Sequence, residues 1–177
     1  MPRNIEIKAR IDSVEALLAV AQALADGPPQ TIEQDDSFFV CANGRLKLRD
    51  FGDGSGELIH YQRADTAGPK LTDYVRVTTR EPAALREALG RAQGMLGRVL
   101  KTRWLLRAGP TRIHLDRVEG LGDFLELEVE LRDGQSEADG VAIADALLQA
   151  LGVSPTQRLA GAYLDLLTRG NVNEPRR

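Results

Sequence analysis

The feature that most constrains this sequence is a regular alternation of aliphatic and charged residues. Residues 45–49 read Arg-Leu-Lys-Leu-Arg, and residues 126–130 read Glu-Leu-Glu-Val-Glu. A period of two is typical of β-strands, because successive side chains of a strand point to opposite faces of the sheet. Each of these strands therefore has one aliphatic face and one charged face, and the fold has to bury the aliphatic one.

This alternation, together with turn and capping signals, predicts eight strands and four helices. The strands are expected at residues 4–10, 32–40, 45–50, 57–63, 73–79, 98–107, 111–118 and 122–132. The helices are expected at residues 12–26, 82–93, 136–152 and 154–169. Since turns join most of the strands, the sheet is mainly antiparallel, and eight strands can close into a barrel. We therefore predict an α+β fold, in which a closed, eight-stranded, mainly antiparallel β-barrel (a tunnel) has helices packed outside it.

Length and composition fit one soluble domain, which we place at residues 1–170, followed by a flexible tail at 171–177. No apolar run approaches the roughly 20 residues that span a bilayer, and the N-terminal residues lack the apolar core of a signal peptide, so no membrane partner is expected. The single cysteine, Cys41, cannot form an internal disulfide, which favours a cytoplasmic location. The net charge of −3 argues against nucleic acid as a partner. A homodimer is compatible with the sequence, since dimers are common.

The charged faces point into the barrel if the helices cover the aliphatic faces. Acidic side chains gather on the strand at 122–132, where carboxylates at alternate positions repel one another unless a divalent cation neutralises them. Basic side chains gather on the other strands, and Arg and Lys suit phosphate oxygens. A polyphosphate with bound metal satisfies both sets. The alternative is a solvated sheet face with cross-strand ion pairs, and the pattern alone leaves both interpretations open.

Several segments, taken in order, resemble a known family. They are Asn4-Ile-Glu-Ile-Lys8, Gly44-Arg-Leu-Lys-Leu-Arg49, Val99-Leu-Lys-Thr-Arg103, Arg112-Ile-His-Leu-Asp116, Gly122-Asp-Phe-Leu-Glu-Leu-Glu-Val-Glu130 and Ala162-Tyr-Leu-Asp-Leu-Leu167. The first is similar to the Glu-x-Glu-x-Lys signature of the CYTH family, also called triphosphate tunnel metalloenzymes, which includes class IV adenylyl cyclases and thiamine triphosphatases. The resemblance covers nearly the whole chain. It implies an eight-stranded tunnel with a polar interior, in agreement with the barrel expected from the alternation.

The resemblance also implies roles for individual residues. A divalent metal ion, Mg²⁺ or Mn²⁺, is expected at Glu6, Asp116, Glu126, Glu128 and Glu130. A triphosphate-containing small molecule is expected at Lys8, Arg45, Lys47, Arg49, Arg63, Arg76, Lys101 and Arg103. The candidate catalytic residues are Lys8, Asp116 and His114. His114 shares the inward face of its strand with Asp116, where it either transfers a proton or lines the barrel as a hydrogen-bonded residue.

Two departures from the family pattern bear on the chemistry. The first acidic position of the signature is Asn4, which offers a carbonyl oxygen but no charge. In several hydrolytic members of the family that this chain resembles, a tyrosine on the second strand works with the signature lysine. This chain has Phe38 and Phe39 there instead. A phenyl ring cannot transfer a proton.

Three functions are compatible with these candidate residues. The first is a class IV adenylyl cyclase-like enzyme, in which the ribose 3′-hydroxyl of ATP attacks the α-phosphorus and gives cyclic AMP and pyrophosphate. The second is a triphosphatase, in which water attacks the terminal phosphorus of an inorganic or organic triphosphate. The third is a non-catalytic module that binds a polyphosphate or nucleotide. Asn4 and the two phenylalanines favour the module. Lys8, Asp116 and the three glutamates of the strand at 122–132 favour an enzyme.

Overall fold

The computed structural model of the protein describes residues 3–63 and 70–171. Within them, the strands are β1 (Asn4–Arg10), β2 (Gln30–Phe39), β3 (Arg45–Asp50), β4 (Gly56–Arg63), β5 (Lys70–Thr79), β6 (Met95–Ala108), β7 (Thr111–Val118) and β8 (Gly122–Glu130). The helices are α1 (Val14–Leu24), α2 (Pro82–Gln93), α3 (Glu137–Ala150) and α4 (Tyr163–Asn171). The strand ends lie within three residues of those expected. The expected tail, beyond Asn171, lies outside the described residues. In the described part of the chain, no helix has the length and apolar character that would let it cross a membrane.

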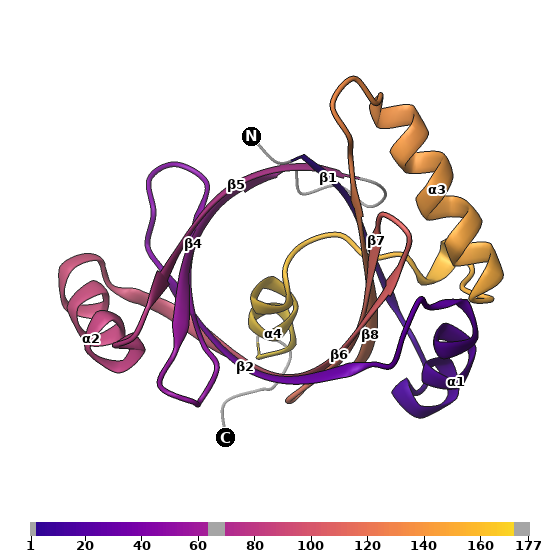
Figure 1. The fold of residues 1–177 in the computed structure, drawn as a ribbon. Coiled ribbons are helices and arrows are strands. Elements are labelled where there is room, and N and C mark those ends of the chain that lie inside the picture. The colour runs from indigo at the N-terminus through magenta and orange to yellow at the C-terminus, as the bar shows by residue number, and fades with distance from the viewer. Residues whose placement is uncertain (1–2, 64–69, 172–177) are drawn as a thin grey trace.

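The strands form a ring. Their order is β1-β5-β4-β3-β2-β6-β7-β8, every neighbouring pair is antiparallel, and β1 pairs with β5 on one side and with β8 on the other, so the pairing closes (Figure 1). Most neighbours also follow one another in sequence, as expected for strands joined by turns. The predicted eight-stranded antiparallel sheet of an α+β fold is confirmed.

The main hydrophobic core lies outside the ring, between the barrel wall and two helices. The wall contributes the aliphatic faces of β1, β7 and β8, with Ile5, Ile7, Ile113, Leu115, Leu125 and Leu127. Helix α1 contributes Val14 and Ala21, and α3 contributes Ala144 and Leu148. Figure 1 shows both helices on this flank of the ring. Because the aliphatic side chains point outward, the charged side chains of the same strands point into the barrel, as the sequence predicts.

Helix α2 packs on the other flank of the ring, against β2 and β3 (Figure 1). Its Arg86 donates to the hydroxyl of Ser37 at 2.9 Å and pairs with Asp35 and Asp50 at 3.0 and 3.1 Å. Since Asp35 belongs to β2 and Asp50 to β3, one guanidinium holds the helix to two neighbouring strands.

The last helix departs from the prediction in two ways. The capping box at Ser154 begins only a 3₁₀ turn, Pro155–Gln157, and the chain then runs extended beside β1, where the amide of Leu159 donates to the carbonyl of Lys8 at 2.9 Å. Gly161 has φ of 85°, which ends any helix before α4 begins. The expectation that all helices pack outside the barrel is wrong for α4, which lies within the outline of the ring in Figure 1.

A second, smaller cluster explains where α4 goes. Tyr163 packs against inward-facing side chains of the barrel, among them Phe38, Val99 and Phe124. A Cβ atom on Gly97 of β6 would lie 2.7 Å from Leu164 Cδ1, so this glycine allows α4 to approach the strand closely. The apolar patch inside one part of the barrel thus binds the helix that the sequence pattern places outside.

Candidate functional site

The barrel encloses a cavity of about 410 Å³. This volume lies in the range of small-molecule sites, about 300–1,000 Å³. Most of the side chains that the sequence predicts for metal binding, phosphate binding or catalysis line it: Glu6, Lys8, Lys47, Arg49, Arg76, Lys101, Arg103, His114, Glu126 and Glu128. The period-two faces of six strands therefore meet in one space. Their charges are distributed unequally around it, which divides the lining into two walls.

The first wall, called the basic wall below, is formed by Lys47 and Arg49 of β3 and by Lys101 and Arg103 of β6. The β3 pair shares one buried carboxylate, Asp36 of β2. Lys47 Nζ lies 3.1 Å from Asp36 Oδ2, and Arg49 donates from two nitrogens, each at 2.7 Å. Burial disfavours ionisation of this carboxyl, but the charges of Arg49 and Lys47 outweigh burial and hold the pKa of Asp36 well below its usual value.

The β6 pair shares a second buried carboxylate, Asp116 of β7. Lys101 donates to it at 3.0 Å, Arg103 donates twice at 2.6 and 2.7 Å, and the hydroxyl of Tyr163 donates at 2.9 Å. Burial opposes ionisation, yet Arg103 and Lys101 hold the pKa of Asp116 far below its usual value. Asp116 was expected beside the metal. Its oxygens instead accept hydrogen bonds from two cations and a phenol, because β6 places Arg103 directly opposite it.

Burial also changes the cations of this wall. Desolvation and the charge of Arg103 lower the pKa of Lys101 to about 7, although Asp116 acts in the opposite direction. Desolvation and Arg49 likewise lower the pKa of Lys47, against the attraction of Asp36. The four cationic side chains outnumber the two carboxylates, so the wall gains from an additional anion, which favours the protonated lysines.

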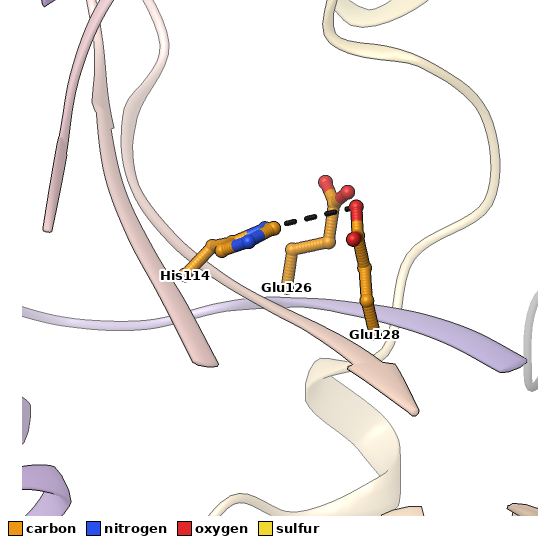
Figure 2. A group of neighbouring side chains, drawn as sticks. All are labelled: His114, Glu126 and Glu128. Carbon is orange, nitrogen blue, oxygen red and sulfur yellow. Dashed lines mark ion pairs between the residues drawn. The ribbon is translucent and has the colours of Figure 1, made fainter. Parts of the chain in front are cut away.

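The second wall, called the acidic wall below, contains Glu126 and Glu128 of β8 and His114 of β7. One potential ligand atom from each of the three lies within 4.8 Å of the others (Figure 2). Glu126 faces Lys8 of β1, with Nζ and Oε2 separated by 3.5 Å. Glu128 accepts two hydrogen bonds from Arg112, at 2.9 and 2.6 Å, both on Oε2.

The protonation states of the acidic wall suit a divalent cation. Burial and the charge of Arg103 lower the pKa of His114 to about 4, although Glu128 and Glu126 act against this. The pKa of Glu126 also lies below its usual value, because Lys8 and Arg103 outweigh the effect of burial. Near neutral pH the group therefore contains a neutral imidazole and carboxylates, which are donors that divalent metals accept.

The other residues predicted for the metal lie around this group. Glu6 lines the cavity and is paired in register with Glu128. Glu130 lies nearer solvent, with a side chain 43% exposed, and pairs with Arg112 at 2.7 Å. Among the described residues, the compact group of potential ligands includes neither of them, nor Asp116.

The remaining predicted phosphate-binding residues are more scattered. Arg76 lines the cavity with a side chain 54% exposed and lies 3.6 Å from Glu57. Arg45 instead forms a two-pronged pair with Asp165 of α4, at 3.1 and 2.8 Å, which holds the helix in place. Arg63 ends β4, and its side chain lies outside the described part of the structure.

The signature lysine and the departures from the signature meet at α4. Lys8 Nζ lies 3.9 Å from the centroid of the Tyr163 ring and donates to the carbonyl of Gly161 at 3.4 Å. Asn4 is buried and lines the cavity, as does Phe38, whereas Phe39 is buried and does not line it. The phenol that lies beside Lys8 thus comes from α4 and not from β2.

Two residues of this site, Asp36 and Tyr163, are not among those predicted from the sequence. Asp36 shares a face with Gln34 and Phe38, but Asp35 beside it hides the alternation that marks the other strands. Tyr163 lies in a motif that the resemblance includes, and the signal overlooked was Gly161, which separates Tyr163 from the preceding turn.

Comparisons with known proteins agree with this architecture. The family model described as CYTH domain matches residues 2–163. The PH1012 protein of Pyrococcus horikoshii has a TM-score of 0.81 at 22% identity, over 92% of this chain and 98% of that one. A candidate adenylate cyclase of Vibrio parahaemolyticus has a TM-score of 0.74 at 18% identity, over 93% and 97% of the two chains.

Another similar structure, from Hippeastrum, is described with a different activity. The candidate adenylyl cyclase HpAC1 of Hippeastrum, described as having a dominant triphosphatase activity, has a TM-score of 0.68 at 15% identity, over 96% of both chains. At these identities the solved structures show that the fold is shared. Among curated proteins, no significant match was found.

Proposed function

The chain belongs to the CYTH family, and from this premise we propose that it is a metal-dependent enzyme that acts on a triphosphate compound inside the barrel. The observation that carries the proposal is the division of one cavity into a basic and an acidic wall. A triphosphate with bound metal is a ligand whose two parts have opposite charge, and it complements both walls together.

The phosphate chain is proposed to lie against the basic wall. Arg49 and Arg103 are each fixed by two hydrogen bonds to a carboxylate, so their guanidinium planes are oriented before the ligand arrives. Such preorganised cations stabilise charge that develops on phosphoryl oxygens without first having to reorient. We assign Asp36 and Asp116 to positioning these cations, and Lys8 to contact with the reacting phosphoryl group. Lys47, Lys101 and Arg76 complete the proposed phosphate site, and Arg63 is retained in it from the sequence.

The metal is proposed to lie at the acidic wall. Glu126 and Glu128 have ligand atoms within 4.8 Å of each other, and Glu6 is paired with Glu128 in register. Mg²⁺ or Mn²⁺ bound there would neutralise charge on the phosphoryl oxygens. Glu130 remains a proposed outer member of this group.

For the reaction, we propose the cyclase-like course, in which ATP gives cyclic AMP and pyrophosphate. Aromatic side chains in the cavity lining support a nucleotide: Phe38, Tyr61 and Tyr74 lie among the cations of β3 and β5, and such rings suit a purine base. Hydrolysis of the terminal phosphate is the second candidate, supported by the described activity of the Hippeastrum neighbour. A binder without turnover is the third, supported by Asn4 in the signature.

Product analysis separates these functions. Purified protein is incubated with ATP, thiamine triphosphate or inorganic triphosphate, each with Mg²⁺ or Mn²⁺, and the products are identified by chromatography. Cyclic AMP with pyrophosphate supports the cyclase, and orthophosphate supports the triphosphatase. Thermal stabilisation without product supports the binder. The absence of both product and thermal stabilisation would contradict the proposal. The Glu128→Gln variant, purified in parallel, reveals any contaminating activity.

A cytoplasmic location and a homodimer belong to this proposal as predictions from the sequence. Size-exclusion chromatography with light scattering measures the oligomeric state. A single domain covering residues 1–170 also stays a prediction, and limited proteolysis tests it, since cleavage is expected only near the termini.

A further inference from the structure

One nitrogen of the acidic wall has no hydrogen-bond partner. Nδ1 of His114 is buried and unpaired among the described residues, and the His114 residue as a whole is 4% exposed. An unsatisfied buried polar atom is destabilising, so native structures rarely retain one unless an ion or a water molecule binds it. The imidazole points toward the two glutamates of β8 (Figure 2).

The spacing at this nitrogen fits a shared ion better than a hydrogen bond. Nδ1 of His114 lies 3.8 Å from Oε1 of Glu128. Hydrogen bonds to nitrogen span about 2.7–3.2 Å. Two ligand atoms on one small divalent ion, each about 2.1 Å from it, can be up to about 4.2 Å apart. Both hydrogen bonds from Arg112 fall on Oε2 of Glu128, and Oε1 is the oxygen that faces the imidazole.

The third member fits with little movement. His114 and Glu126 are paired directly in the register of β7 and β8, so the two backbones hold them together. The ligand atoms of all three residues lie within 4.8 Å of one another, and a small rotation of a glutamate side chain brings this to the span of one ion.

We infer that His114, Glu126 and Glu128 hold one divalent transition-metal ion through an imidazole nitrogen and carboxylate oxygens, and that this site prefers such an ion to Mg²⁺. The inference rests on the proposed function for its metal requirement and extends it to metal selectivity. It assigns His114 as a ligand, a role that the sequence pattern left between proton transfer and lining.

Two physical reasons favour a transition metal. Imidazole suits Fe²⁺, Co²⁺, Ni²⁺ and Zn²⁺, whereas Mg²⁺ prefers oxygen donors and gives up its waters reluctantly. In addition, Lys8 and Arg112 already neutralise much of the charge on the two glutamates. An ion held only by charge gains less from such carboxylates, whereas bonding to the imidazole nitrogen is not cancelled by the paired cations. Mn²⁺, which accepts both donor types, is a practical probe.

The test uses the full chain, freed of metal, with Mn²⁺ alone and no triphosphate. Free Mn²⁺ is measured by electron paramagnetic resonance during titration, and Mg²⁺ is then added as competitor. Wild type is expected to bind one Mn²⁺ at least about tenfold more tightly than Mg²⁺. His114→Gln is expected to weaken Mn²⁺ binding at least about tenfold and Mg²⁺ binding much less.

A spectroscopic measurement on the unmutated protein supports the same test. The chain has two histidines. The other one, His60, belongs to β4. Its Nε2 lies 2.7 Å from the carbonyl oxygen of Asn43, which is in the turn between β2 and β3. Pulsed resonance of bound Mn²⁺ is expected to show coupling to an imidazole nitrogen in wild type and in the control His60→Gln, and to lose it in His114→Gln.

The inference is overturned if wild-type Mn²⁺ shows no nitrogen coupling, or if His114→Gln keeps both the affinity and the preference over Mg²⁺. Thermal melts of the metal-free variants verify that they fold. Because triphosphate is absent, these outcomes are separate from those of the product analysis. Nitrogen-bound Mn²⁺ in a protein that neither binds nor converts a triphosphate leaves this inference standing and removes the proposed function.

Discussion

Both walls of the barrel interior contain buried carboxylates, but the carboxylates differ in how completely their partners surround them. In the basic wall, Asp116 accepts four hydrogen bonds of 2.6 to 3.0 Å from Lys101, Arg103 and Tyr163. In the acidic wall, Oε2 of Glu126 lies 3.5 Å from Lys8, and Glu128 accepts short hydrogen bonds from Arg112 on Oε2, whereas its Oε1 lies 3.8 Å from His114. Short bonds within the protein surround Asp116, whereas each glutamate of the acidic wall has an oxygen at a longer spacing from its partner, Lys8 or His114.

This difference distinguishes carboxylates that hold cationic side chains in position from carboxylates that can bind a metal ion. Carboxylates that accept a full set of short hydrogen bonds hold their cations in place, and exchanging those bonds for bonds to a metal gains little. Carboxylate oxygens with longer contacts, such as Oε1 of Glu128 beside the neutral imidazole, can accept an ion while the short bonds on the other oxygen remain. On this comparison, we assign Asp116 to the cations of the proposed phosphate site, and Glu126 and Glu128 to the proposed metal site.

The largest effect is expected on activity, from a substitution in the acidic wall. Glu128→Gln removes one carboxylate charge with little change of shape, so metal-dependent turnover should fall about a thousandfold, since the ion's stabilisation of phosphoryl charge amounts to several kcal/mol. Steady-state kinetics measures this, and urea unfolding should show a stable protein. Glu119→Gln, at an exposed turn, is the matched control and should keep full turnover. Equal turnover in both variants would remove Glu128 from the metal site.

The next largest effect is expected on stability, from substitutions in the basic wall. Asp116→Asn leaves Lys101 and Arg103 buried without their counter-ion, so the free energy of unfolding should fall by about 3 kcal/mol. Asp36→Asn should cost less, because Lys47 and Arg49 have side chains 17% and 11% exposed, against 3% and 7% for Lys101 and Arg103. Urea denaturation of both variants ranks them. The reverse ranking would show that burial of the cations does not set the cost.

A smaller effect is expected on the pH dependence of ligand binding. With a pKa of about 7, Lys101 is mostly neutral at pH 8 in the free protein. A bound triphosphate favours the charged form, so binding takes up a proton, and affinity falls as pH rises from 7 to 9 by at most about tenfold per pH unit. Calorimetry in buffers of different ionisation enthalpy measures the uptake. Lys101→Arg stays charged and should take up about one proton fewer at pH 8. Equal uptake in both proteins would contradict the lowered pKa.

The smallest effect concerns the contact between α4 and the basic wall. Tyr163→Phe removes one of the four hydrogen bonds to Asp116 but keeps the ring beside Lys8 and Phe124. Stability should fall by about 1 kcal/mol, the usual value of one such bond, as measured by urea unfolding. A loss as large as that in Asp116→Asn would mean that the phenol, and not the cations, is the main partner of this carboxylate.

The strands, their faces and the inward direction of the charges could be predicted from sequence, because alternation is a local property and the helices need an aliphatic surface to cover. The partner of each charge could not. Asp116 belongs with Arg103 because β6 and β7 pair in a register that brings the two residues opposite each other. Glu126 likewise meets Lys8 and His114 through pairing with both neighbouring strands. Register between strands distant in sequence is set by the closure of the barrel, which single-strand periodicity does not contain.

The position of α4 could not be predicted for a related reason. The motif at Ala162 to Leu167 alternates as a helix with one apolar side, and the usual place for that side is the outer surface of a sheet. The interior of this barrel contains its own apolar patch, with Phe38, Val99 and Phe124, and that patch is formed by strands that come together only in the folded protein.

The two walls together are proposed to bind one triphosphate with metal. Isothermal titration calorimetry with a non-hydrolysable imido analogue of triphosphate tests it directly, in Mn²⁺ and in chelator, on wild type and on the double variant Arg49→Gln with Arg103→Gln. We expect one ligand per chain, binding at least about tenfold tighter with metal, and loss of binding in the double variant. Binding that is indifferent to metal, or that survives in the double variant, would contradict it.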